Sequence, residues 1–197
     1  YCVKDIDSKA LSFNSSGDIN IAIVAYYAAP FVAVGAKRPE FMRQYFDAKD
    51  GVSCEIISTI KSHDDKHVYV PDYPYDSFNQ IEGQDVLRLF DAGVSVVGAS
   101  WSKQLRRHFD LLDSKDQLPG VVIFTGNPFY YFGIAEYIKN AFGLLVVLDY
   151  RDPFVNNPLM FKTKEVKDIQ AKMEERFNRN ADLIAVVNRP CLELLVG

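Results

Sequence analysis

Short uninterrupted apolar runs recur along the chain, separated by longer segments in which apolar residues return every three or four positions. Residues 19–25 read Ile-Asn-Ile-Ala-Ile-Val-Ala, a β-branched run with the length of a strand that is buried on both faces. Similar runs predict strands at residues 52–59, 67–70, 121–125, 144–149 and 182–187. A sheet made of such strands needs helices on both of its faces.

Helical spacing of apolar residues fills the segments between these runs. It predicts helices over residues 38–46, from residue 83 onward, over 102–113, 130–142 and 164–180, and a helix that begins within 190–195. Ser102 is expected to cap one helix, and Gly143 to end another. The alternation of buried strands and helices predicts an α/β fold, a Rossmann-like open parallel sheet with helices on both faces.

The chain of 197 residues has the size of a single domain. Residues 1–17 form a polar N-terminal extension, and the predicted domain covers residues 18–197. With 48% hydrophobic and 24% charged residues, the composition is that of a soluble globular protein. The uncharged stretch at residues 21–36 contains Pro30 and is too short for a membrane span, and no signal peptide is evident. We therefore expect a cytoplasmic location.

The charge balance narrows the classes of partner. The 22 basic and 26 acidic residues leave a net charge of −4, which argues against nucleic acid and means that an anionic ligand needs a local basic pocket. Lys103, Arg106 and Arg107 form one basic cluster, either a peripheral contact with anionic lipid headgroups or simply a solvated helix face. The histidines and cysteines show no metal-ligand spacing, so no metal site is expected.

In open parallel sheets ligands bind at the carboxyl ends of the strands, which directs attention to the loops after residues 25, 125 and 149. The first loop, residues 26–38, brings Gly35, Lys37 and Arg38 to the start of a helix. Free backbone N–H groups and two cations there would suit an anion. The alternative interpretation is a helix start with solvated charges.

The other two loops carry aromatic and charged side chains. Asn127 and the nearby ring of Tyr130 would contact a sugar or an apolar acceptor, unless the aromatic cluster at residues 129–132 is mostly helix packing. Asp149, Arg151 and Asp152 end a buried strand. Because isolated charges at a core edge are costly, these three are expected to pair with each other or with a ligand. An Arg–Asp pair that only braces the loop is the alternative.

Three segments together resemble the N-terminal domain of family-four glycosyltransferases of the GT-B fold. Residues 26–30 (Tyr-Tyr-Ala-Ala-Pro) and 35–39 (Gly-Ala-Lys-Arg-Pro) are similar to the family pattern "YYFPP, then GAxRP". Residues 148–154 (Leu-Asp-Tyr-Arg-Asp-Pro-Phe), with Asn157 and Pro158, resemble "DFRDPW, then NP". Residues 181–188 resemble the strand pattern "ADxVVxVS". The resemblance extends over about residues 19–195.

The resemblance implies the acceptor-side half of an enzyme that transfers a sugar from a nucleotide-sugar with retention and generally without a metal ion. The donor would lie on a second Rossmann-like domain that is absent from these residues, so the isolated chain is expected to be inactive or nearly so. Asp152, or less favourably Asp149, would orient or deprotonate the acceptor hydroxyl. Arg151 or Arg38 would offset the charge of the leaving diphosphate. The acceptor would be a glycan or glycolipid of surface polysaccharide assembly, and no further cofactor is implied.

Two departures from the family pattern stand out. Bulkier residues occupy positions 32 and 33, where the family often has a glycine pair, and Asn188 stands where Ser is common but caps a helix equally well. Two other functions stay open. One is half of a GT-B sugar-nucleotide 2-epimerase, whose acid–base residues are not evident here. The other is a stand-alone flavodoxin-like domain that binds a ligand or a partner.

Overall fold

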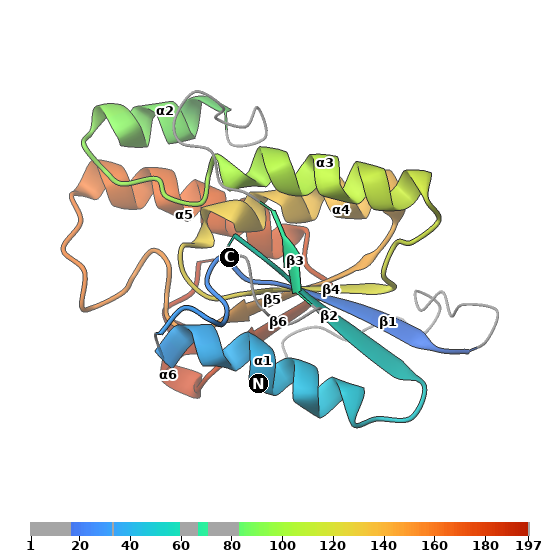
Figure 1. Ribbon diagram of the computed structural model, residues 1–197. Coiled ribbons are helices and arrows are strands. Elements are labelled where there is room, and N and C mark those ends of the chain that lie inside the picture. The colour runs from blue at the N-terminus through green and yellow to red at the C-terminus, as the bar shows by residue number, and fades with distance from the viewer. Residues whose placement is uncertain (1–16, 33, 60–66, 71–82, 197) are drawn as a thin grey trace.

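The computed structural model describes residues 17–32, 34–59, 67–70 and 83–196, and the predicted α/β fold is confirmed. All the strands of its six-stranded sheet are parallel, in the order β3-β2-β1-β4-β5-β6 (Figure 1). The strands are β1 Ile19–Val24, β2 Val52–Ser58, β3 His67–Tyr69, β4 Val121–Thr125, β5 Leu145–Tyr150 and β6 Leu183–Val186. Apart from residue 17, the predicted polar extension lies outside the described residues.

Helices cover both faces of this sheet unequally. They are α1 Val34–Asp47, α2 Gly83–Asp91, α3 Trp101–Ser114, the 3-10 helix η2 Phe129–Gly133, α4 Ile134–Phe142, α5 Lys164–Arg179 and α6 Arg189–Glu193. Helices α2 to α5 lie over one face, and α1 and α6 lie over the other (Figure 1). The sheet is therefore enclosed on both sides, as its continuous apolar strands require.

The core divides into two clusters because successive side chains of a strand point to opposite faces. Ala22 and Val24 of β1 face the larger cluster, which includes Trp101 and Phe109. Ile21 and Ile23 belong to the smaller cluster beneath α1, together with residues of β2 and β4. The larger cluster carries most of the buried aromatic rings, so the α2–α5 face holds the main core.

Three predicted helix boundaries differ from the structure. Helix α1 begins at Val34, four residues before the prediction, and contains Pro39. Helix α3 begins at Trp101, so the predicted Ser102 cap is wrong, and Ser102 is buried inside the helix. The predicted helix 130–142 is divided into η2 and α4. The predicted end of α4 is confirmed, because Gly143 adopts a φ of 67° there.

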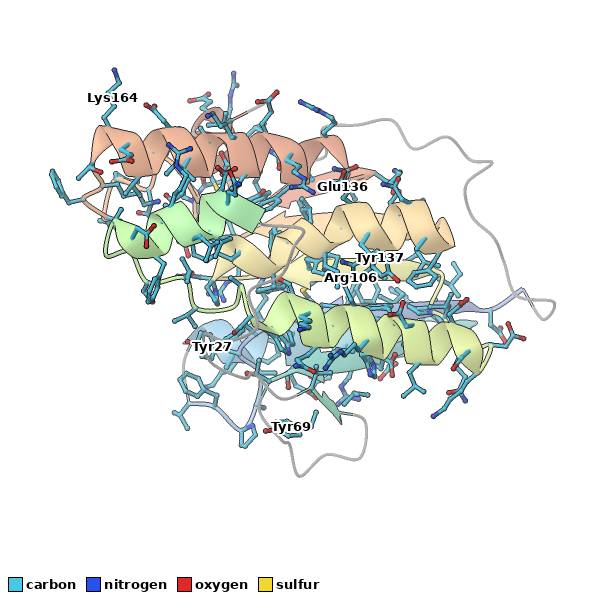
Figure 2. All side chains as sticks on the ribbon, turned by 90° about the horizontal axis from the view of Figure 1, so that it is seen from above. Tyr27, Tyr69, Arg106, Glu136, Tyr137 and Lys164 are labelled. Carbon is cyan, nitrogen blue, oxygen red and sulfur yellow. The ribbon has the colours of Figure 1, made fainter. Side chains whose placement is uncertain are left out.

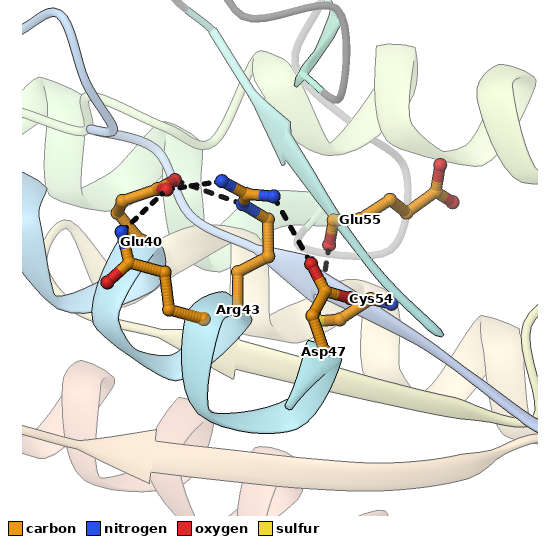
Figure 3. A network of polar contacts seen from close by, with 6 residues as sticks. Glu40, Arg43, Asp47, Cys54 and Glu55 are labelled. Atoms are coloured by element: carbon orange, nitrogen blue, oxygen red, sulfur yellow. Dashed lines mark hydrogen bonds and ion pairs between the residues drawn. The ribbon is translucent and has the colours of Figure 1, made fainter. Parts of the chain in front are cut away.

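A polar network ties α1 to the sheet (Figure 3). The largely buried Arg43 guanidinium donates to Glu40 at 3.1 Å and to Asp47 at 3.2 Å. The other carboxylate oxygen of Asp47 accepts from the backbone N–H of Cys54 in β2 at 2.9 Å. Helix α1 is thereby held in one position relative to the strands, which matters because its first turns contribute to the candidate site.

Candidate functional site

The loops that follow β1, β4 and β5 meet at the carboxyl edge of the sheet. Strand β4 pairs with both β1 and β5, so the chain direction along the sheet reverses between β1 and β4. A crevice opens at such a switch point because the flanking loops leave the sheet toward opposite faces. Thr125 of β4 and Asp149 of β5 are directly paired, which places the ends of the second and third loops side by side.

A bidentate ion pair joins the first loop segment to the third. Arg38 Nε and Nη2 each donate to a carboxylate oxygen of Asp149 at 2.7 Å, and the Thr125 hydroxyl donates to Asp149 Oδ2 at 2.5 Å. The Asp149 side chain is 1% exposed, whereas that of Arg38 is 38% exposed. The hydrogen bond to Asp149 raises the pKa of Arg38 above its ordinary value. Both carboxylate oxygens of Asp149 are therefore engaged within the protein.

Arg151 supplies a hydrogen bond that helix α1 cannot make by itself. In a regular helix the carbonyl of Gly35 would accept from the N–H of residue 39, but Pro39 has no N–H and its ring crowds that carbonyl. Arg151 Nη1 donates to the Gly35 carbonyl at 3.1 Å instead. A Cβ on Gly35 would lie 2.5 Å from this nitrogen, so a glycine permits the approach.

Gly126 supports the same guanidinium from the second loop. Its φ of +87° favours glycine, and a Cβ at this position would lie 3.5 Å from Arg151 Nη1. The guanidinium is therefore in contact with all three loop segments: it extends from the third loop, binds the start of α1 and packs beside Gly126. The approach of this side chain explains the glycine at position 35, whereas the glycine at position 126 is explained by its own positive φ.

The structure divides the predicted site residues into three groups. The first group is held by the contacts just described, and we call it the braced centre: Gly35, Arg38, Asp149 and Arg151. Lys37, Asn127 and Asp152 expose their side chains at the surface of the same three loop segments. Tyr130 is buried and lines a cavity on the α5 side of the sheet. Of the three charges predicted to pair around residue 149, Asp149 pairs with Arg38 rather than with Arg151.

That cavity, which we call the α5 cavity, has a volume of about 440 Å³. It lies beside the switch point, between the loops after β1, β4 and β5, helix α5 and the segment that follows α2. Its walls are mostly apolar, with a few polar side chains among them. The lining residues used below are Tyr27, Val97, Asn127, Phe129, Tyr130, Phe154, Met160, Phe161, Lys162 and Gln170.

The aromatic cluster at residues 129–132 serves two purposes. Tyr131 and Phe132 are fully buried in the larger core cluster. The Tyr131 hydroxyl donates to the Thr125 carbonyl at 2.5 Å and so fixes the end of β4. Phe129 and Tyr130 are also buried, but they line the α5 cavity. All four rings thus belong to the larger core cluster, and two of them also form a cavity wall.

A buried polar stripe on α5 escaped the sequence analysis. Gln170, Glu174 and Asn178 lie four residues apart on one helix face and are 3%, 0% and 4% exposed. Gln170 Nε2 donates to the Tyr130 hydroxyl at 2.8 Å, and Asn178 Oδ1 accepts from the hydroxyl of Tyr150 at 2.9 Å. The spacing of four was the available signal, but it is hidden among the many charged residues of this helix.

The middle residue of the stripe, Glu174, holds the end of the described chain. Its Oε2 accepts from the backbone N–H of Val196 at 2.7 Å, and Asn178 Nδ2 donates to the Val196 carbonyl at 2.7 Å. Burial raises the pKa of Glu174 to about 7. The predicted cap of the preceding short helix is confirmed, because Asn188 Oδ1 accepts from the N–H of Cys191 at 2.8 Å.

A second hollow of about 560 Å³, the α1 groove, lies on the opposite side of the braced centre. The guanidinium groups of Arg38 and Arg151 form its polar part, and apolar side chains form the rest. These are Phe41, Met42, Tyr45, Phe46 and Val187. The carboxyl edge therefore has an apolar cavity on one side and a groove with a basic lining on the other.

Comparison of the chain with protein-family models and with curated protein sequences finds no match. Within the described residues, no helix is long and apolar enough to cross a membrane. No three His, Cys, Asp or Glu side chains are grouped as a metal site in the part of the chain that the structure describes. A functional assignment therefore depends on the site geometry and on the motif resemblance.

Proposed function

We propose that the chain is the acceptor-side half of a retaining glycosyltransferase that uses a nucleotide-sugar donor. One observation carries the proposal: the two motif segments that resemble family-four enzymes, 111 residues apart at Arg38 and Asp149, bind each other directly. The contact lies at the carboxyl edge, next to the α5 cavity, where ligands of open parallel sheets bind. A second Rossmann-like domain would hold the donor.

The exposed and braced groups suit different parts of this reaction. The acceptor hydroxyl oxygen bonds to the anomeric carbon of the donor as the bond from that carbon to the diphosphate oxygen breaks. Asp152 is exposed and free of the ion pair, so it is better suited than Asp149 to orient that hydroxyl or take its proton. Asp149 is a positioning residue that holds Arg38.

Of the two arginines, Arg151 is the better partner for the leaving diphosphate. Arg38 is already neutralised by Asp149, whereas Arg151 donates to a neutral carbonyl and keeps more of its charge. Lys37 is exposed on the first turn of α1, next to Arg38 in the sequence, and adds a second cation. The Asn127 amide, exposed at the cavity wall, would donate to and accept from acceptor hydroxyls.

We place the enzyme in the cytoplasm, in surface polysaccharide or glycolipid assembly. For the basic cluster on α3, a solvated face and a lipid contact both stay open, and one of its cations contacts an aromatic ring. The Arg106 guanidinium lies 3.9 Å from the centre of the Tyr137 ring, and Figure 2 shows the two side chains next to each other. In such a cation–π contact the guanidinium is attracted to a ring of the protein itself.

The test uses the longest protein that the gene encodes, supplied with a panel of nucleotide-sugars and sugar acceptors. Replacing Asp152 by Asn is expected to lower kcat about a hundredfold or more, with acceptor affinity nearly unchanged. Asp113→Asn, an exposed carboxylate on α3, is the control and should retain full activity. Unchanged transfer by Asp152→Asn would remove this residue from the chemistry, and absence of transfer from every donor would overturn the proposal.

A stand-alone ligand- or partner-binding domain is the second candidate, favoured by the mostly apolar α5 cavity, whose volume of about 440 Å³ suits a small molecule. The gene sequence beyond the codon for residue 197 decides between the two. A second Rossmann-like domain supports sugar transfer, and a stop codon supports the binding domain. A donor that is epimerised without an acceptor would instead indicate a 2-epimerase.

A further inference from the structure

The α5 cavity has the size and the lining of a small-molecule site. Its volume of about 440 Å³ lies within the range of roughly 300–1,000 Å³ that such sites occupy. Aromatic rings form much of the wall, among them Tyr27, Phe129 and Phe154. Flat rings of this kind favour an aromatic or alkyl group over a strongly hydrated sugar.

The mouth of the cavity is apolar as well. Phe161, which lines it, is 98% exposed, and the neighbouring lining residue Met160 is 54% exposed. Leu159, next in the chain, is 91% exposed. An apolar group that projects from the cavity would cover these side chains and remove their surface from water, which favours its binding.

Among the described residues, the cavity lining holds a single charged side chain, which is bound to backbone carbonyls. Lys162, the one cation in its lining, donates to the carbonyls of Phe154 and Val155, and none of the described lining residues is acidic. Its ammonium is half-buried and already committed to the loop after β5. A cation would be repelled by this ammonium, and an anion would have to compete with two carbonyls for its N–H groups, so the lining favours a neutral occupant.

One buried polar atom in the wall has no hydrogen-bond partner within the part of the chain that the structure describes. Gln170 Nε2 donates to the Tyr130 hydroxyl, but among the described residues no group donates to Gln170 Oε1. Leaving a buried acceptor unpaired is unfavourable. A ligand hydroxyl that enters the cavity would supply the missing donor once the amide turns toward it.

We propose that the α5 cavity binds a neutral apolar group that carries a hydroxyl, and that Gln170 recognises this hydroxyl. Within the proposed function, on which this part rests, the group is the aglycone to which the acceptor sugar is attached. The acceptor is thus an aryl or alkyl glycoside with a hydroxyl on its apolar part. The sugar would lie toward Asn127 and Asp152, and the aglycone toward Tyr130 and Gln170.

The test titrates glycosides into the 197-residue chain by isothermal titration calorimetry. Phenyl glucoside is expected to bind about tenfold or more tightly than methyl glucoside, because only its ring enters the cavity. Octyl glucoside tests whether an alkyl group is accepted in place of the ring. Val97→Trp, at a lining residue that is 41% exposed, should abolish the advantage of the apolar glycosides. Leu111→Trp, on α3 away from both hollows and 48% exposed, is the matched control and should preserve it.

The hydroxyl is tested by a second pair of ligands. Para-hydroxyphenyl glucoside should bind about fivefold more tightly than phenyl glucoside, and Gln170→Leu should remove this difference while leaving the affinity for phenyl glucoside. Equal affinities in the wild-type chain would overturn the role of Gln170. Because Val97 is at the surface, its variant decides whether the cavity is used even if Gln170→Leu does not fold.

Failure of this inference is distinguishable from failure of the proposed function. Phenol carries the ring and hydroxyl without a sugar. If phenol binds in a Val97-dependent way and no glycoside does, the acceptor role is overturned while the cavity still binds a neutral hydroxylated group. If the longer enzyme transfers sugars but Val97→Trp leaves the affinity for apolar glycosides unchanged, the cavity assignment alone is overturned.

Discussion

Arg38 binds both carboxylate oxygens of Asp149, joining a helix near the start of the chain to a strand end 111 residues later. The Asp149 side chain is 1% exposed, so this pair is the anchor of the carboxyl edge. The same edge holds Arg151 against Gly35. The contacts within the candidate site are thus long-range, and each can be tested by its effect on the folded state.

Replacing Asp149 by Asn removes the charge that Arg38 and Thr125 share. The expected loss in the free energy of unfolding is about 2 kcal/mol, below the usual range for a broken buried pair because water partly solvates the Arg38 guanidinium. Urea denaturation measures it. Asp152→Asn is the control: its exposed carboxylate should change stability by less than about 0.5 kcal/mol. Equal losses in the two variants would contradict the distinction between a braced and a free carboxylate.

Arg151 and Pro39 are expected to be energetically coupled through the Gly35 carbonyl. Arg151→Ala should cost about 1 kcal/mol, because the carbonyl loses its donor. In a Pro39→Ala background residue 39 regains its N–H and satisfies the same carbonyl, so the cost of Arg151→Ala should fall to near zero. A double-mutant cycle in urea measures the coupling. Additive effects would show that the two residues act independently.

The buried Glu174 is expected to make stability depend on pH. Its pKa is raised to about 7 in the folded chain, above an unfolded value near 4.5, so the folded state favours the protonated form. The contribution of this carboxyl group to the free energy of unfolding is full below about pH 4.5. It is lost as pH rises toward about 7, a loss on the order of 3 kcal/mol. Glu174→Gln should therefore stabilise the chain at about pH 8 and change it little at about pH 4.

Other groups that face Glu174 do not obscure this measurement. Burial raises the pKa of Tyr150 and of Cys191, so both stay neutral between these pH values. Burial lowers the pKa of Lys162, and the positive charge of this lysine acts to lower the pKa of Glu174. The difference between wild type and Glu174→Gln, followed by urea denaturation across the pH range, isolates the carboxyl. A difference that does not vary with pH would refute a raised pKa.

Removing the Tyr131 hydroxyl should leave the end of β4 without one of its hydrogen bonds. Tyr131→Phe is expected to cost about 1–3 kcal/mol, because the Thr125 carbonyl and its surroundings are shielded from water. Tyr137→Phe is the matched control. Its hydroxyl donates to Asp110 at the surface, and water can replace it, so a change below about 0.5 kcal/mol is expected. Thermal unfolding compares the two, and similar shifts would count against a specific role for Tyr131.

Much of the fold could be predicted because its signals are local. The run at residues 121–125 matches β4, and the other strands lie within a residue or two of the apolar runs that predicted them. Strands buried on both faces must be apolar throughout, so they are visible without knowledge of their neighbours. The start of α1 was missed for a local reason as well: Pro39 favours the first turn of a helix, but here the helix begins at Val34 and continues through it.

The candidate site could be predicted only in part. The three loops and their charged residues follow from the rule that ligands bind at strand ends. Which charges pair could not be predicted, because the partner of Asp149 comes from α1 and not from its own loop. The stripe of Gln170, Glu174 and Asn178 was hidden, because polar residues on a charged helix normally face water.

By itself the sequence determined the order of strands and helices, the parallel character of the sheet and the edge at which polar loops would gather. These depend on periodicity and on the burial that apolar runs demand. Only the tertiary structure decided which carboxylate is braced, which arginine completes the hydrogen bonding of α1, and that a cavity lies beside Gln170. The physical reason is that such contacts join residues far apart in the chain, and their free energy depends on distance and burial that no local pattern encodes.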